Sequence, residues 1–202
     1  MGTGKTVTMS FVISELAKRN KYRIPRPGLY YCYCHDGQAG QALYVVSVLT
    51  LALLDHVRML RKVFYIWVNE EEDAGRPNPG ADLRRLGQWL QDMISKLERP
   101  MHIIIDGFDE CDETSRKYLA NLFDHLTRSN PRLKTLVASR PTSRAHLGAA
   151  TRIQMPSNSS RDRLIVEFGI KNWLDHLPEN VQKLIADEMS EKAEGSAIWV
   201  SV

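Results

Sequence analysis

The feature of the sequence that most constrains its fold is the alternation of short apolar runs with segments of helical periodicity. The runs 29–34, 101–106 and 133–139 have the length and the aromatic, Ile, Val and Leu content of strands. Between them, apolar residues recur in steps of three and four, as in Leu83, Leu86, Leu90, Met93 and Leu97. Strands that alternate with helices predict an α/β protein with a parallel sheet wrapped by helices.

The same patterns predict the order of the elements. We expect helices over 5–19, 39–56, 81–97, 114–128, 161–176 and 178–194, and a fourth strand over 151–155. The acidic stretch 70–80, dense in Pro and Gly, predicts a loop. After Pro156 the pattern becomes purely helical, so we expect two parts, an α/β core over 1–156 and the start of a helical subdomain over 157–202.

The composition excludes several classes of protein. With 43% hydrophobic and 25% charged residues the chain is too apolar for a disordered protein. A net charge of +3, from scattered Lys and Arg, argues against a nucleic-acid partner. The longest apolar run, 42–54, is shorter than the roughly 20 residues of a membrane span. The first residues lack a basic segment followed by an apolar one, so we expect no signal peptide. Three cysteines form neither a disulfide framework nor a zinc motif, so we expect a cytoplasmic, reducing compartment.

The first candidate site is the run Gly2, Thr3, Gly4, Lys5 and Thr6 at the start of the first expected helix. It matches the second half of the phosphate-binding pattern G-x-x-x-x-G-K-[ST]. In that pattern the backbone N–H groups and the helix N-terminus face a polyphosphate, the Lys reaches the β- and γ-phosphates, and the hydroxyl binds Mg²⁺. Five matching residues also fit a glycine-rich start of an ordinary helix.

The second candidate site is the apolar strand 102–106, which ends in Asp106 and is followed by Asp109 and Glu110. A carboxylate at the end of a buried strand can hold Mg²⁺ beside a phosphate, so Asp106 and Thr6 are the candidate metal ligands. We assign Glu110 as the base that activates water, with Asp109 supporting the metal. The neighbouring Asp112 and Glu113 are expected only to cap the following helix.

The third candidate is Arg140, which directly follows the strand 133–139. Carboxyl ends of parallel strands form the ligand crevice of such sheets. The planar guanidinium stays charged and can bridge two phosphate oxygens, so Arg140 is a candidate sensor of the γ-phosphate.

These three motifs in this order resemble the NACHT-type P-loop NTPases of the STAND class, above all fungal proteins with a nephrocystin-like NTPase module. The resemblance rests on Gly-Thr-Gly-Lys-Thr, on Ile-Ile-Ile-Asp-Gly-Phe-Asp-Glu-Cys and on Leu-Val-Ala-Ser-Arg-Pro. It also includes Tyr-Tyr-Cys-Tyr-Cys at 30–34 and the segment 192–199. Ala138 departs from the family, which usually has Thr at that position.

The resemblance implies a three-layer P-loop NTPase fold and a switch that binds and slowly hydrolyses ATP or GTP with Mg²⁺. In such signalling proteins, which often act in fungal self/non-self recognition or cell death, effector and repeat domains flank the module, and the module self-associates. The first glycine of the pattern and the strand before it would precede Met1. Without that strand, we expect this chain to bind nucleotide poorly and to fold poorly, since each unsatisfied buried backbone group costs about 1–3 kcal/mol.

Two other functions remain open at this point. The incomplete phosphate-binding pattern also suits a scaffold or oligomerisation module that binds nucleotide weakly or not at all. A small-molecule or nucleoside kinase would use the same loop, but no arginine-rich acceptor lid follows, and the acidic residues after Asp106 fit water activation better.

Overall fold

The computed structural model describes residues 5–35, 37–140, 151, 153, 167, 170–171 and 174–192. The chain forms two compact units, one of residues 9–150 and the other of residues 1–8 with 151–202. The sheet and most of the described helices belong to the first unit. The expected division into 1–156 and 157–202 stays a prediction.

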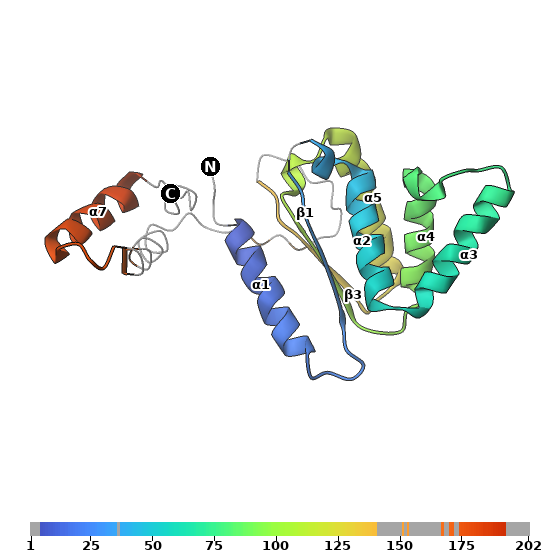
Figure 1. The fold of residues 1–202 in the computed structure, drawn as a ribbon, viewed down its shortest axis with the longest axis horizontal. Helices are drawn as coiled ribbons and strands as arrows, with labels where there is room; N and C mark the ends of the chain where they lie inside the picture. Colours follow the sequence, from blue (N-terminus) through green and yellow to red (C-terminus); the bar gives the residue numbers. More distant parts are fainter. Residues whose placement is uncertain are drawn as a thin grey trace. The chain divides into compact units, whose positions relative to one another are not determined.

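Three parallel strands form the sheet: β1 (Gly28–Tyr33), β2 (Met101–Asp106) and β3 (Leu133–Val137). Their spatial order follows the sequence, with β2 in the centre (Figure 1). Tyr33 pairs with Asp106, and Ile105 pairs with Val137, so the three carboxyl ends lie at the same edge. The predicted α/β class with a parallel sheet is confirmed.

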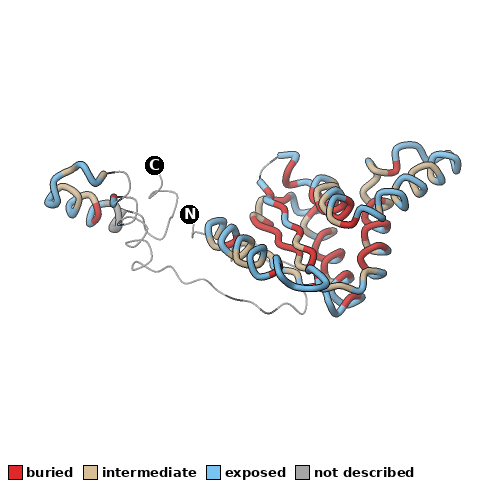
Figure 2. Tube along the Cα trace, turned by 60° about the horizontal axis from the view of Figure 1, so that its bottom comes forward, coloured by how far each residue is buried: buried red, intermediate tan, exposed pale blue. Residues whose placement is uncertain are grey.

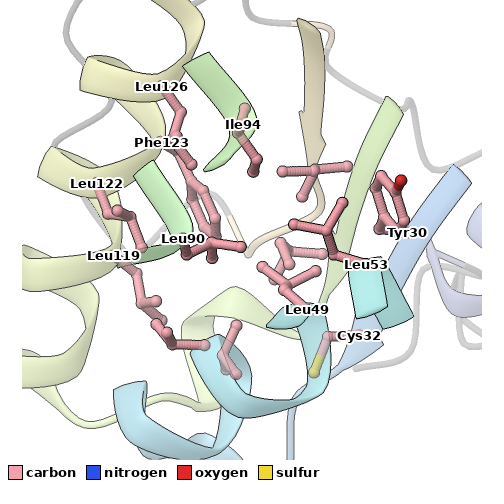
Figure 3. Packing of buried hydrophobic residues seen from close by; sticks show 14 of the residues in the cluster. Tyr30, Cys32, Leu49, Leu53, Leu90, Ile94, Leu119, Leu122, Phe123 and Leu126 are labelled. Atoms are coloured by element: carbon pink, nitrogen blue, oxygen red, sulfur yellow. The ribbon is translucent and has the colours of Figure 1, made fainter. Parts of the chain in front are cut away.

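Helices form the main core on one face of the sheet. Here α2 (Ala42–His56) contacts β1, α5 (Glu113–Ser129) contacts β3, and α4 (Leu83–Lys96) packs against both helices. The strands alternate in side-chain direction, and the set that faces these helices includes Tyr30, Cys32, Met101, Ile103 and Ile105. Figure 3 shows Leu residues and Phe123 from the three helices meeting this set.

The helix α1 (Lys5–Asn20) lies on the opposite face of the sheet. Within the sheet-bearing unit, Ser10 Oγ lies 3.2 Å from Tyr33 Oη, and Leu16 borders a small hollow with Ile104 and Leu136. The arrangement is therefore helix, sheet and helices in three layers. Figure 2 shows the buried residues concentrated in the strands and in the helices behind them.

The prediction from the sequence was wrong for one helix and for one loop. A helix that was not predicted, α3 (Met59–Asp73), extends through Glu70–Asp73, so the expected loop 70–80 begins only after Asp73. Acidic residues are unfavourable in the last turn of a helix, because they lie at the negative end of the helix dipole. For this reason the acidic residues 70–73 were predicted as part of a loop. The predicted helix 39–56 begins at Ala42, after a separate 3₁₀ turn, η1 (Gln38–Gly40). Two more 3₁₀ turns are η2 (Pro79–Ala81) and η3 (Phe108–Glu110).

In the C-terminal part, α7 (Glu179–Lys192) confirms the second of the two helices predicted there. Residues 167, 170 and 171 are helical, within the first. Of the strand expected over 151–155, Thr151 and Ile153 are described, and both lie outside regular structure. The remaining residues of that stretch lie outside the described residues. None of the described helices combines the length and the apolar character that a membrane span requires.

The buried Asn130 joins the end of α4 to the start of β3, and its replacement by leucine should destabilise the fold. Its amide donates to Ile94 O at 2.8 Å, and its Oδ1 accepts from Arg132 N at 3.0 Å. Asn130→Leu leaves these groups unpaired, so we expect a loss of about 2 kcal/mol in the free energy of unfolding by urea. The neighbouring Arg128→Ala, which breaks an exposed ion pair with Asp124, should cost at most about 0.5 kcal/mol. Equal losses for the two variants would contradict this role.

Candidate functional site

The central strand β2 delivers Asp106 into a buried position at the carboxyl edge of the sheet. Asp106 is only 4% exposed, and among the described residues its Oδ1 has no hydrogen-bond partner. Its backbone carbonyl is satisfied, since Asp106 O accepts from Cys34 N at 2.8 Å. A buried carboxylate oxygen without a donor is costly for the fold. It is also an open acceptor for a cation or a ligand donor.

A tight turn follows Asp106 at once. Gly107 has a φ of +69°, and a Cβ built on it would lie 2.3 Å from Cys34 O. Only glycine fits both the backbone conformation and the space. The chain then enters η3, where the wholly buried Phe108 anchors the loop in the core.

The end of β3 meets this loop and brings Arg140 to Asp109. Phe108 N donates to Ala138 O at 3.0 Å. Beyond that contact, Arg140 N lies 2.9 Å from Asp109 Oδ1 and Arg140 Nε lies 3.0 Å from Asp109 Oδ2. The structure thus brings Asp109 and Arg140 together as a two-oxygen clamp.

The two acidic residues after Gly107 have different surroundings. The Asp109 side chain is 8% exposed, and Arg140 contacts both of its oxygens. The Glu110 side chain is 35% exposed, and its Oε1 lies 3.9 Å from Arg140 Nη2. Of the two, Glu110 is the more accessible to water.

A residue without a sequence signal supports this loop from α5. Arg116 Nη1 donates to Asp109 O at 2.9 Å and to Cys111 O at 2.7 Å. The loop carbonyls are therefore held by a guanidinium from the next helix. Nothing in the spacing distinguishes Arg116 from a solvated arginine, because the contact depends on how the loop turns.

Asp112 caps α5, as predicted, and also helps to fix α2. Its Oδ1 accepts from Ser115 N at 2.8 Å and its Oδ2 accepts from Ser115 Oγ at 2.6 Å. Ser115 Oγ in turn accepts from Ala42 N at the start of α2, at 2.9 Å. The hydrogen bonds from the Ser115 hydroxyl and backbone lower the pKa of Asp112. Glu113 lies in the first turn of α5 and pairs with Lys117 at 2.7 Å.

The three thiols of Cys32, Cys34 and Cys111 are buried and form no disulfide. Cys32 lies in β1, Cys34 directly follows β1, and Cys111 directly follows η3. Hydrogen bonding with Cys111 and Cys32, together with burial, raises the pKa of Cys34, which therefore stays a neutral thiol. Cys32 and Cys34 are part of the hydrophobic core, as predicted.

The phosphate-binding pattern is described only in part. Lys5 and Thr6 form the first turn of α1, with Thr6 exposed, while Gly2, Thr3 and Gly4 lie outside the described residues. The expected meeting of Lys5 and Thr6 with Asp106 stays a prediction.

The described residues hold no cluster of three or more His, Cys, Asp and Glu arranged around a metal. Asp106 nevertheless suits Mg²⁺, which is commonly held by one or two carboxylates and completed by water and phosphate oxygens. The observation that fits this metal is its Oδ1, which no described residue contacts through a hydrogen bond.

Replacement of Gly107 by alanine should destabilise the protein by at least about 2 kcal/mol, because it combines a left-handed backbone with a clash against Cys34 O. Gly75→Ala is the matched control. Gly75 also has a positive φ, +74°, but a Cβ there would meet nothing within 4 Å. The control should lose only about 1 kcal/mol in urea unfolding. Equal losses at the two glycines would show that contact with Cys34 is unimportant.

Asp112→Ala should lower the free energy of unfolding by about 1 kcal/mol at neutral pH, because the helix cap is lost. A lowered folded-state pKa stabilises the fold above the unfolded-state pKa, and this contribution disappears as the pH falls through the folded-state pKa. The gap between wild type and Asp112→Ala should therefore narrow below about pH 4. Asp112→Asn, which keeps a capping oxygen but not the charge, should lose part of this stability at neutral pH, and its gap from wild type should close below about pH 4. A gap that stayed constant down to pH 2 would contradict the role of the charge.

The chain matches a known protein family. A family model described as Nephrocystin 3, N-terminal, matches residues 1–140, which include the sheet and all the candidate site residues. No curated protein and no solved structure matches the chain significantly. Since the match covers well over half of the sequence, the chain belongs to the nephrocystin 3 N-terminal family.

Proposed function

We propose that this protein binds ATP or GTP with Mg²⁺ and hydrolyses it slowly, as the switch module of a NACHT-type STAND signalling protein. The observation that carries the proposal is the buried Asp106, which lies at the edge where the three strands end and whose Oδ1 has no partner among the described residues. A fold keeps such a costly group most readily where a ligand uses it. Membership of the nephrocystin family supports the same site.

Nucleotide binding is assigned to the first turn of α1. A helix N-terminus offers unpaired N–H groups and partial positive charge to phosphate oxygens. Gly2, Thr3 and Gly4 would let the backbone approach the phosphates, and the ammonium of Lys5 would neutralise the β- and γ-phosphates.

Thr6 and Asp106 are the residues that would hold Mg²⁺. When bound, the ion neutralises charge on the phosphate oxygens. The Thr6 hydroxyl is exposed on α1, and Asp106 offers its open carboxylate oxygen.

Hydrolysis is assigned to Glu110. In this step the water oxygen bonds to the γ-phosphorus, the bond to the β–γ bridging oxygen breaks, and Glu110 accepts a proton from the water. Asp109 is less suited to this role, because its two oxygens already contact Arg140. A γ-phosphate would compete with Asp109 for the Arg140 guanidinium, which makes that ion pair a candidate sensor of the nucleotide state.

The alternative is a scaffold or oligomerisation module with little nucleotide affinity. The Arg140–Asp109 ion pair favours it, since a cation that is already neutralised by a neighbouring carboxylate attracts phosphate less strongly. Measurement of nucleotide binding separates the two functions.

Binding of a fluorescent ATP analogue should be at least tenfold weaker in Lys5→Ala than in wild type, because the phosphates lose a charge-assisted contact. Lys18→Ala, on the exposed face of the same helix, is the control and should leave affinity unchanged. Glu110→Gln should retain binding but lower hydrolysis about a hundredfold. Competition with GTP would define the preferred base.

Two results would reject this function. Hydrolysis that survives both Lys5→Ala and Glu110→Gln would show that the assigned residues are not the site. A folded variant that carries the whole phosphate-binding pattern, and still binds neither ATP nor GTP at millimolar concentrations, would favour the scaffold.

A further inference from the structure

The helix α3 is packed far less deeply than its neighbours. None of residues 59–73, all of them described, is buried, although Leu60, Phe64 and Trp67 pack partly against the core. Val63 is 41% exposed and Ile66 is 44% exposed. Figure 1 shows α3 as the outermost helix of this unit, beside α4. It therefore presents apolar side chains that the described fold does not cover.

A groove of about 380 Å³ runs between α3 and α4. On the α3 side it is lined by Val63, Ile66 and Trp67, and on the α4 side by Trp89 and Met93. The two Trp rings lie 6.0 Å apart and both pack against Phe64. The floor is thus an aromatic cluster, and aromatic side chains, which have few rotatable bonds, lose little entropy when a partner binds.

Carboxylates border this apolar floor on both sides. Among the lining residues, Glu70, Glu71 and Asp92 oppose a single cation, Arg85. Glu71 is already neutralised, because Arg76 Nε lies 2.7 Å from its Oε2 and Arg85 Nε lies 3.7 Å away.

The other two carboxylates have no cationic partner in the part of the chain that the structure describes. Glu70 on α3 is exposed, and the Asp92 carboxylate on α4 accepts a hydrogen bond from the neutral Gln88 Nε2 at 2.9 Å. Each wall of the groove thus offers one unneutralised negative charge beside aromatic rings. This combination suits Lys and Arg side chains, whose charge can contact a carboxylate while the stem lies on an aromatic face.

We propose that the groove between α3 and α4 is the docking site for a basic amphipathic helix of a partner protein. Apolar residues spaced at i, i+3 or i+4 and i+7 would fill the groove above Trp67 and Trp89, as in other helix-in-groove complexes. Lys or Arg residues flanking them would pair with Glu70 and Asp92. This surface lies on α3 and α4, whereas the proposed nucleotide site uses α1 and the strand ends, so the two can be tested separately.

The test uses the whole chain and a designed peptide of about 16 residues, long enough to be partly helical. It carries Leu at helical spacing and Lys at the flanking positions, and binding is followed by tryptophan fluorescence and calorimetry. Glu70→Lys should weaken binding about fivefold through loss of one partly exposed ion pair and added repulsion. Ile66→Ser should weaken it about tenfold through lost apolar contact.

Matched controls lie on the same helix. Glu72→Lys makes the same charge change and Tyr65→Ser removes an exposed apolar side chain, yet neither residue lines the groove. Both should bind the peptide within twofold of wild type, and urea unfolding should show that all four variants are folded.

Three results would overturn the proposal. One is equal weakening by Glu70→Lys and Glu72→Lys. A second is equal binding of a control peptide in which Glu replaces every Lys. The third is self-association of the wild type that Glu70→Lys abolishes, which would assign the groove to a second copy of this chain.

Discussion

Burial of β2 on both faces of the sheet is the constraint on which the rest of the structure depends. Ile103 and Ile105 face α2, α4 and α5, while Ile104, also buried, faces the side of α1. A strand with apolar residues on both faces must lie inside a sheet, so β1 and β3 pair with it on either side. Because β2 is central, Asp106 at its end is buried. On an edge strand the same carboxylate would have remained in contact with water.

The turn at Gly107 determines where the residues after this buried strand lie, and so shapes the candidate site. Because the backbone reverses there with a positive φ, Phe108 enters the core, and Asp109 reaches the residues that follow β3. Arg116 holds the carbonyls of the same loop, and Ser115 connects it to the start of α2. The loop is therefore held by contacts from three elements. If Glu110 and Arg140 bind a ligand, as we propose, this support lowers the entropic cost of binding.

Sequence reasoning located β2, α4 and α5 well, because their apolar spacing is regular and Asp112 supplies a cap that local residues identify. It also placed Asp109 and Arg140 at one edge, since strand ends in a parallel sheet converge. It missed α3, whose apolar side is only half covered and whose last turn is acidic. The contacts of Arg116 and of Ser115 with Ala42 could not be predicted, because they join residues brought together only by the folded loop.

The free-energy cost of burying a polar side chain helps to distinguish a residue kept for function from one that stabilises the fold. Asn130 and Ser115 are also buried and polar, but they satisfy the backbone groups of neighbouring elements and so stabilise the fold. Asp106 satisfies no described group with its Oδ1, although the same strand position could hold an apolar residue at lower cost. Residues that lower the stability of the fold are found mainly at functional sites. Other buried polar side chains in the described part of the chain, such as Thr50 and Tyr30, also have an atom without a partner, but Asp106 is the one carboxylate among them. Because it also stands at the end of a strand, we assign the proposed chemistry to Asp106 before the better satisfied Asp109.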